Sequence, residues 1–252
     1  MFWPDGPLVL GVFVERLHRF GAMVKIHGRQ EYCHVTNSGR LKELLYPGAK
    51  VALVDHLPQL KIKNLKFKIR RKTRYAVRLA YYRKKWVCIE ANIAPKLLEE
   101  AWQQGRVKEL KPYDHLKVEV PLNAHTRFDF QALNSRTGER AWVEVKCVTL
   151  VDERNVARFP DAPSERATKH LRELMLLSRE PRTKCFVFFI VQNPFGKAVG
   201  PKDDTDPVFG ETIRKASKSK VVLKAFRANI GLKRARLAQP VPVLVQAVLD
   251  HP

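Results

Sequence analysis

The stretch from residue 126 to residue 150 constrains the fold most, because it combines two strand-like arms with a turn-forming centre. The first arm reads Thr-Arg-Phe-Asp-Phe-Gln-Ala-Leu and the centre reads Asn-Ser-Arg-Thr-Gly. The second arm, Arg-Ala-Trp-Val-Glu-Val-Lys-Cys-Val-Thr-Leu, is again rich in β-branched and aromatic residues. This pattern is typical of a β-hairpin, so we expect two adjacent antiparallel strands here.

The second arm predicts a polar and an apolar face, because side chains two positions apart in a strand share a face. Glu144 and Lys146 then point the same way, and Val143, Val145 and Cys147 point the other way.

The first arm follows the same rule. We expect Arg127, Asp129 and Gln131 on a polar face, with Phe128 and Phe130 on the opposite face.

If the two polar faces coincide, Asp129 and Glu144 can bind one divalent cation with Lys146 beside it. Hard cations such as Mg²⁺ prefer carboxylate and carbonyl oxygens, and such an ion can activate water for attack on a phosphate. The alternative is a solvated strand face with a cross-strand ion pair, which is the more common origin of an alternating Glu-Val-Lys sequence.

The charge balance favours a polyanionic partner. The chain has 47 Lys and Arg residues against 25 Asp and Glu residues, a formal net charge of +22. A charge so far from zero indicates nucleic acid first and an anionic membrane surface second. No apolar run approaches the roughly 18 residues of a membrane helix, and no secretion signal is evident. Because the four cysteines lack metal-site or disulfide-scaffold spacing, we expect reduced thiols and a cytoplasmic protein.

Basic residues concentrate between residues 61 and 85, where 12 Lys or Arg residues occur, and no acid lies between Asp55 and Glu90. Tyrosines and other aromatic residues alternate with them, a pattern that favours a groove for a phosphate backbone with stacked bases. The alternative is a solvated strand face whose aromatic residues belong to the core. The candidate nucleic-acid-binding residues in this stretch are Lys66, Lys68, Arg70, Arg71, Lys72 and Arg74.

The order of expected elements predicts two domains of mixed α and β structure. Short strands at residues 8–17, 20–27, 31–35 and 51–54, a helix-like piece at 41–45 and a basic strand-like run at 65–82 predict a small β-barrel, most simply an OB-fold, over residues 1–84. Residues 85–252 predict a helix, three strands, a long helix at 163–178, a buried strand, and a further helix and strand. Asp161 or Ser164 could cap the long helix.

Several short motifs resemble those of the sugar fermentation stimulation protein A family and of the PD-(D/E)XK nuclease-like core. The motifs are Asn37-Ser38-Gly39, Pro47-Gly48, Arg127-Phe-Asp-Phe, Val143-Glu-Val-Lys, Val148-Thr-Leu, Phe159-Pro-Asp-Ala-Pro-Ser-Glu-Arg and Lys169-His-Leu-Arg-Glu-Leu. The chain departs from the family at Thr36, where a Pro is usual, and at Arg40-Leu41, where Ser-Met is usual. Arg127 also stands near the place where the superfamily has its Pro.

The resemblance implies an N-terminal OB-like domain, a C-terminal PD-(D/E)XK nuclease-like domain with a mixed sheet, and DNA binding with little sequence preference. It also implies metal ligation by Asp129 and Glu144, with Mg²⁺ or Mn²⁺ as the expected ion. Lys146 would orient or activate the attacking water, and Glu100 on the preceding helix would assist. The family's name comes from regulation of sugar metabolism.

Three further basic residues are candidates for DNA contact: Arg127, and Arg166 and Lys169 at the start of the long helix. A helix N-terminus with basic side chains favours a phosphate, although Glu165 and Lys169 could form a simple i, i+4 pair. Gln192 and His170 are expected to be structural.

Two functions remain open. The first is a metal-dependent DNA phosphodiesterase acting on double-stranded rather than single-stranded DNA. The second is a non-catalytic DNA-binding regulator that has kept the fold and its acidic pocket, since fold alone does not prove chemistry.

Overall fold

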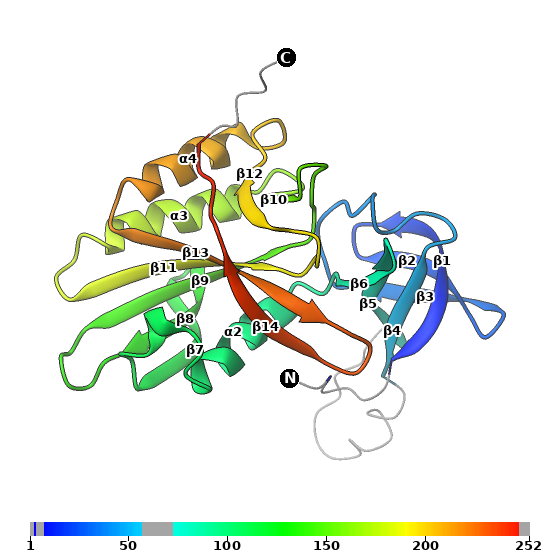
Figure 1. Cartoon of the computed structure of the whole chain (residues 1–252), viewed down its shortest axis with the longest axis horizontal. Coiled ribbons are helices and arrows are strands. Elements are labelled where there is room, and N and C mark those ends of the chain that lie inside the picture. Colours follow the sequence, from blue (N-terminus) through cyan, green and yellow to red (C-terminus); the bar gives the residue numbers. More distant parts are fainter. Residues whose placement is uncertain (1–2, 4–7, 57–72, 247–252) are drawn as a thin grey trace.

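The computed structural model describes residue 3 and residues 8–56 and 73–246, which form two units side by side (Figure 1). The first unit is a small barrel, and the second is a large sheet with helices on both faces. No helix in these ranges combines the length and apolar character needed to cross a membrane.

The first unit contains a closed five-stranded barrel. Its strands are β1 (Val9–His18), β2 (Gly21–Ile26), β3 (Arg29–Val35), β4 (Lys50–Asp55) and β5 (Tyr75–Tyr82). Neighbouring strands pair antiparallel, and a parallel pairing between β3 and β5 closes the ring. Val24, Val51 and Val77 are fully buried inside it. The expected OB-like barrel is therefore confirmed.

A sixth strand, β6 (Lys85–Cys88), pairs with the end of β5 outside the ring and leads into the second unit. The expected domain boundary after residue 84 thus falls between barrel closure and β6, and its position stays a prediction. The helix-like piece expected at residues 41–45 is a hydrogen-bonded turn instead, because Pro47 and Gly48 leave too little chain for a helix.

The second unit is built on a six-stranded mixed sheet, as expected. Its strands in spatial order are β14 (Ala235–Val241), β13 (Val221–Ile230), β11 (Thr183–Val191), β9 (Arg140–Val148), β8 (Thr126–Leu133) and β7 (His115–Asn123). The three central strands run parallel, and both edges are antiparallel. The continuous apolar run of β11 fits its central position, buried on both faces. A short parallel pair, β10 (Val156–Phe159) and β12 (Ala198–Pro201), lies beside this sheet.

In the described part of the chain, three helices cover the sheet (Figure 1). Helix α2 (Ile93–Gln103) packs on one face, and α3 (Glu165–Leu177) and α4 (Pro207–Ser217) pack on the other. Ser164 and Asp206 cap α3 and α4 by accepting hydrogen bonds from backbone N–H groups in the first turn. A single 3₁₀ turn, η1 (Lys108–Leu110), follows α2.

The expectation that Phe128 and Phe130 share a face is wrong. Phe128 packs with Trp142 under α3, whereas Phe130 packs with Val143 under α2. Before Phe130, strand β8 pairs with β7 but no longer with β9, so Phe128 is not held to the face that Phe130 shares with Val143.

Polar side chains join the two units. Gln192, fully buried at the end of β11, donates hydrogen bonds to the carbonyls of Cys88 and Glu90 at 2.9 and 3.0 Å. Asn37 of the barrel donates to the carbonyl of Ile89 at 2.8 Å. These bonds satisfy backbone groups in the connecting segment, so they fix how the barrel meets the sheet.

Candidate active site

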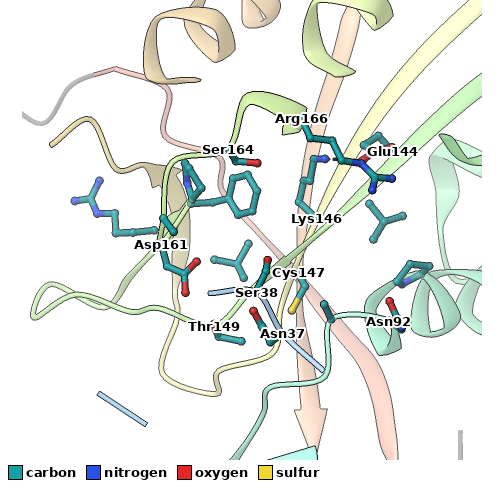
Figure 2. A pocket seen from close by; sticks show the side chains of 18 of the residues that line it. Asn37, Ser38, Asn92, Glu144, Lys146, Cys147, Thr149, Asp161, Ser164 and Arg166 are labelled. Atoms are coloured by element: carbon teal, nitrogen blue, oxygen red, sulfur yellow. Dashed lines mark hydrogen bonds and ion pairs between the residues drawn. The ribbon is translucent and has the colours of Figure 1, made fainter. Parts of the chain in front are cut away.

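A cavity of about 300 Å³ opens at the junction of the two units, and we call it the acidic pocket (Figure 2). Its lining comes from Arg19 and the loop at Asn37 and Ser38 in the barrel, the start of α2, Asp129 of β8, the second half of β9, and residues 158–166 leading into α3. The site is therefore assembled from both domains.

The acidic pocket contains Asp129 and Glu144 together, as the hairpin pattern predicts. Asp129 lies where β8 stops pairing with β9, and its Oδ2 accepts a hydrogen bond from the backbone N–H of Val145 at 2.7 Å. This bond turns the Asp129 carboxylate toward β9, where Glu144 stands one residue earlier.

Glu144 is buried, with 5% of its surface exposed. Its Oε1 lies 2.5 Å from Lys146 Nζ and 2.7 Å from Nδ1 of His170 on α3. Its Oε2 is buried and has no hydrogen-bond partner among the residues that the structure describes. A buried carboxylate oxygen without a partner is costly, so this atom fits a ligand that supplies positive charge.

The two carboxylates titrate differently. Burial, followed by repulsion from Glu144, raises the pKa of Asp129 to about 7. Burial also disfavours ionised Glu144, but the charges and hydrogen bonds of Lys146 and His170 together outweigh it, and the pKa of Glu144 is lowered. A divalent cation between the two groups would relieve both the burial penalty and the repulsion.

Arg166 and Lys146 supply positive charge to the same pocket, and their side chains lie together beside Glu144 in Figure 2. Arg166 stands in the first turn of α3, and its charge attracts Asp129. The pocket therefore combines acidic with basic side chains, a composition suited to a metal ion and a phosphate together.

Asp161 closes the opposite side of the acidic pocket (Figure 2). It follows the cis peptide bond Phe159–Pro160. Its carboxylate accepts hydrogen bonds from the backbone of Arg40 and Leu41, and it lies directly against Gly39. Asp161 thus holds the barrel loop against the second unit and does not cap α3.

Two models of known families match the chain. The "SfsA N-terminal OB domain" matches residues 14–89, and the "Sugar fermentation stimulation protein RE domain" matches residues 92–234. The chain belongs to the sugar fermentation stimulation protein (SfsA) family. The SfsA homolog of Desulforamulus reducens is 36% identical over 94% of this chain and 92% of its own length. That of Acetivibrio thermocellus is 36% identical over 96% of this chain and 99% of its own.

The fold also matches that of a solved SfsA structure. The SfsA of Pyrococcus furiosus, described as a complex with Ca²⁺, superposes with a TM-score of 0.82. It is 26% identical and covers 97% of this chain and 98% of its own. The family expected from the sequence motifs is therefore confirmed.

Not every candidate site residue reaches the acidic pocket. Glu100 does not line it, because Glu100 lies near the end of α2 beside Arg106, while the start of that helix borders the cavity. Arg127 is exposed and lies 3.6 Å from Glu119, and Lys169 points to solvent from α3.

The basic stretch is described only in part. Lys66, Lys68, Arg70, Arg71 and Lys72 lie outside the described residues. Arg74 is exposed, and its guanidinium binds both carboxylate oxygens of Asp55 at 3.0 and 2.8 Å. A phosphate would therefore compete with Asp55 for Arg74.

Sequence reasoning missed three features of the site. His170 was expected to be structural, yet it contacts Glu144; its position four residues after Arg166, on the same helix face, was the available signal. Arg19 and Asn92 also line the acidic pocket, and no local pattern distinguishes them.

Proposed function

We propose that this SfsA-family protein is a divalent-metal-dependent DNA phosphodiesterase with its active site in the acidic pocket. The observation that carries the proposal is the pair of carboxylates, Asp129 and Glu144, that share one open cavity with Lys146. A protein that only binds DNA gains nothing from two carboxylates facing a polyanion.

The donor set fits a hard divalent cation. Asp129 and the partnerless Oε2 of Glu144 would hold the ion. No group of three or more His, Cys, Asp or Glu residues suited to a metal occurs in the described part of the chain. Carbonyl oxygens, water and the substrate phosphate would complete the shell, as is usual for Mg²⁺ and Mn²⁺. The Ca²⁺ named for the Pyrococcus furiosus relative is a cation of the same hard class.

The chain's own groups account for the remaining chemistry. The bound ion would lower the pKa of a water molecule and offset charge on the phosphate. Lys146, held at 2.5 Å from Glu144, is placed to orient that water or to stabilise the negative charge that builds on the phosphate oxygens. Arg166 at the pocket wall suits a non-bridging phosphate oxygen.

DNA is the proposed polyanion because the net charge of +22 supplies attraction that does not depend on sequence. Binding of this kind predicts little base preference, in agreement with the expectation from the SfsA resemblance.

The test is incubation of the purified protein with supercoiled plasmid in EDTA, Mg²⁺ or Mn²⁺. Two variants are assayed in parallel: Glu144→Ala, and the control Glu180→Ala, which removes one acid from an exposed site after α3. We expect nicking that requires metal, is lost in Glu144→Ala and persists in Glu180→Ala. DNA affinity in EDTA should stay equal or rise in Glu144→Ala, because one negative charge is gone.

Two outcomes would count against the proposal. Retarded but uncut plasmid in every lane would favour the DNA-binding regulator instead. Equal loss of DNA binding and nicking in Glu144→Ala would mean that the variant is misfolded or that the site is wrongly assigned, and circular dichroism separates these two.

A further inference from the structure

A second cavity, of about 580 Å³, lies on the outside of the barrel next to the acidic pocket. We call it the aromatic pocket. The end of β1, the following turn and β3 contribute four of its rings, those of His18, Phe20, Tyr32 and His34, and His56 adds a fifth. Its volume falls in the usual range for small-molecule sites.

The rings of the aromatic pocket are available to a ligand. Phe20 and Tyr32 are 43% and 42% exposed, so neither serves the barrel core. Hydrogen bonds fix the arrangement: His18 Nε2 lies 2.9 Å from the Tyr32 hydroxyl, and His34 Nδ1 lies 2.9 Å from the Phe20 carbonyl oxygen. A preorganised set of exposed rings is suited to stacking a flat aromatic ligand.

The remaining walls favour an anionic ligand with hydrogen-bonding edges. The acid Glu90 is paired with Arg78 at 2.6 Å, and the exposed Lys96 adds positive charge. Thr36 contributes a buried hydroxyl with no hydrogen-bond partner among the described residues. A nucleotide has the required flat ring, polar edge and negative charge.

The two pockets are neighbours. Asn92 lines both of them, and its side chain does not cap α2. Arg19 lines the acidic pocket while Phe20 lines the aromatic pocket, and the Arg19 guanidinium lies 5.5 Å from the centre of the Phe20 ring. One nucleic-acid strand can therefore reach both pockets.

We propose that the aromatic pocket binds an unpaired base of the DNA strand whose phosphate occupies the acidic pocket. This inference rests on the proposed function and narrows its substrate to DNA with a single-stranded segment, such as a tail, gap or loop. The reason is physical: a base inside a duplex is stacked on its neighbours and paired, so it cannot stack on Phe20 or Tyr32.

The test is fluorescence anisotropy in EDTA with three labelled probes: a single-stranded oligonucleotide, a blunt duplex, and the same duplex with a single-stranded tail. The variant Phe20→Ala/Tyr32→Ala should bind the single strand and the tailed duplex roughly tenfold to a hundredfold more weakly, because each stacked base contributes about 1–3 kcal/mol. Affinity for the blunt duplex should not change. Phe20→Trp should keep the wild-type affinities.

The matched control is Tyr46→Ala, which removes a 47% exposed tyrosine from the same domain but from neither pocket. It should leave all three affinities unchanged. Replacing single bases of the tail by abasic sites should weaken wild-type binding at one main position and leave the double variant unaffected.

The outcomes separate this inference from the proposed function. Equal weakening on the blunt duplex, or none on the single strand, would reject the aromatic pocket as a base site while leaving metal-dependent nicking untouched. Failure of the wild-type protein to bind any of the three probes would reject DNA as the partner and both proposals with it.

Discussion

Single residues decide the charge balance of the acidic pocket. Glu144 has one oxygen bound by Lys146 and His170 and one oxygen without a partner among the described residues, whereas Asp129 is held by a backbone N–H. The two acids therefore respond to pH and to metal in different ways.

Asp129 should make the metal-free protein less stable as pH rises toward neutrality. Its folded pKa of about 7 exceeds the ordinary value of 3.8, so between these values the folded state keeps a proton that the unfolded state has lost. Unfolding free energy then falls with rising pH across that window. The pKa of Glu144 is lowered, so its contribution has the opposite sign and is lost only in acid.

The measurement is urea unfolding in EDTA across this pH range. Asp129→Asn should remove most of the fall and be more stable at neutral pH by on the order of 2 kcal/mol, because Asn can still accept the Val145 hydrogen bond. Mg²⁺ should stabilise the wild-type protein more as pH rises, and Asp129→Asn little. A flat wild-type profile would contradict the assignment.

His170 should act as a positioning residue for Glu144. Removing such a partner of a metal ligand typically costs about tenfold to a hundredfold in metal affinity. We expect that loss in His170→Ala by Mn²⁺ titration calorimetry. His170→Asn should retain more affinity, since its amide nitrogen can replace Nδ1. Because His170 is buried, both variants should melt earlier; equal loss of metal affinity in both would indicate a packing role only.

At the scale of elements, the loop at residues 37–39 and the segment before α3 act as one joint. Asp161 accepts hydrogen bonds from the backbone of Arg40 and Leu41, and Arg16 donates to the carbonyls of Arg40 and Asn37 at 3.2 and 3.1 Å. The Asn37-Ser38-Gly39 motif and the motif that begins at Phe159 therefore contact each other across the domain junction.

Gly39→Ala should destabilise the protein by about 1–3 kcal/mol, because the added methyl group would occupy the space of the Asp161 carboxylate. The control is the double variant Gly39→Ala/Asp161→Ala. If the two residues are in contact, its loss in urea unfolding should be smaller than the sum of the single losses. Additive losses would mean that the loop and Asp161 act independently.

At the scale of the whole molecule, the net charge of +22 should govern DNA affinity through salt. Each lost phosphate contact lowers the slope of log affinity against log salt by about 0.9. Replacing Lys68, Arg70, Arg71 and Arg74 together by Ala should therefore flatten the slope by up to about 3 to 4. The measurement is anisotropy titration over a range of salt concentrations.

The matched control removes the same number of charges from the groove at the ends of α3 and α4, by replacing Arg179, Lys215, Lys218 and Lys220 with Ala. It should change the slope much less. Equal flattening in both variants would assign DNA binding to overall charge and remove the basic stretch as a distinct interface.

The sequence by itself determined the hairpin, the family and the pairing of Asp129 with Glu144 in one site. The alternation of side chains along β9 assigned Glu144 and Lys146 to one face. The central strand β11 followed from its apolar run, and the helices α3 and α4 followed from apolar positions and capping residues. These features depend on neighbours along the chain, so local patterns contain them.

Only the tertiary structure decided which residues complete the site. Asn92 and Ser38 enter the acidic pocket through the docking of two domains, and His170 reaches Glu144 because α3 packs over β11. Phe128 and Phe130 pack on opposite faces of the sheet, and this depends on where β8 stops pairing with β9. Such contacts join residues distant in sequence, and no local periodicity encodes them.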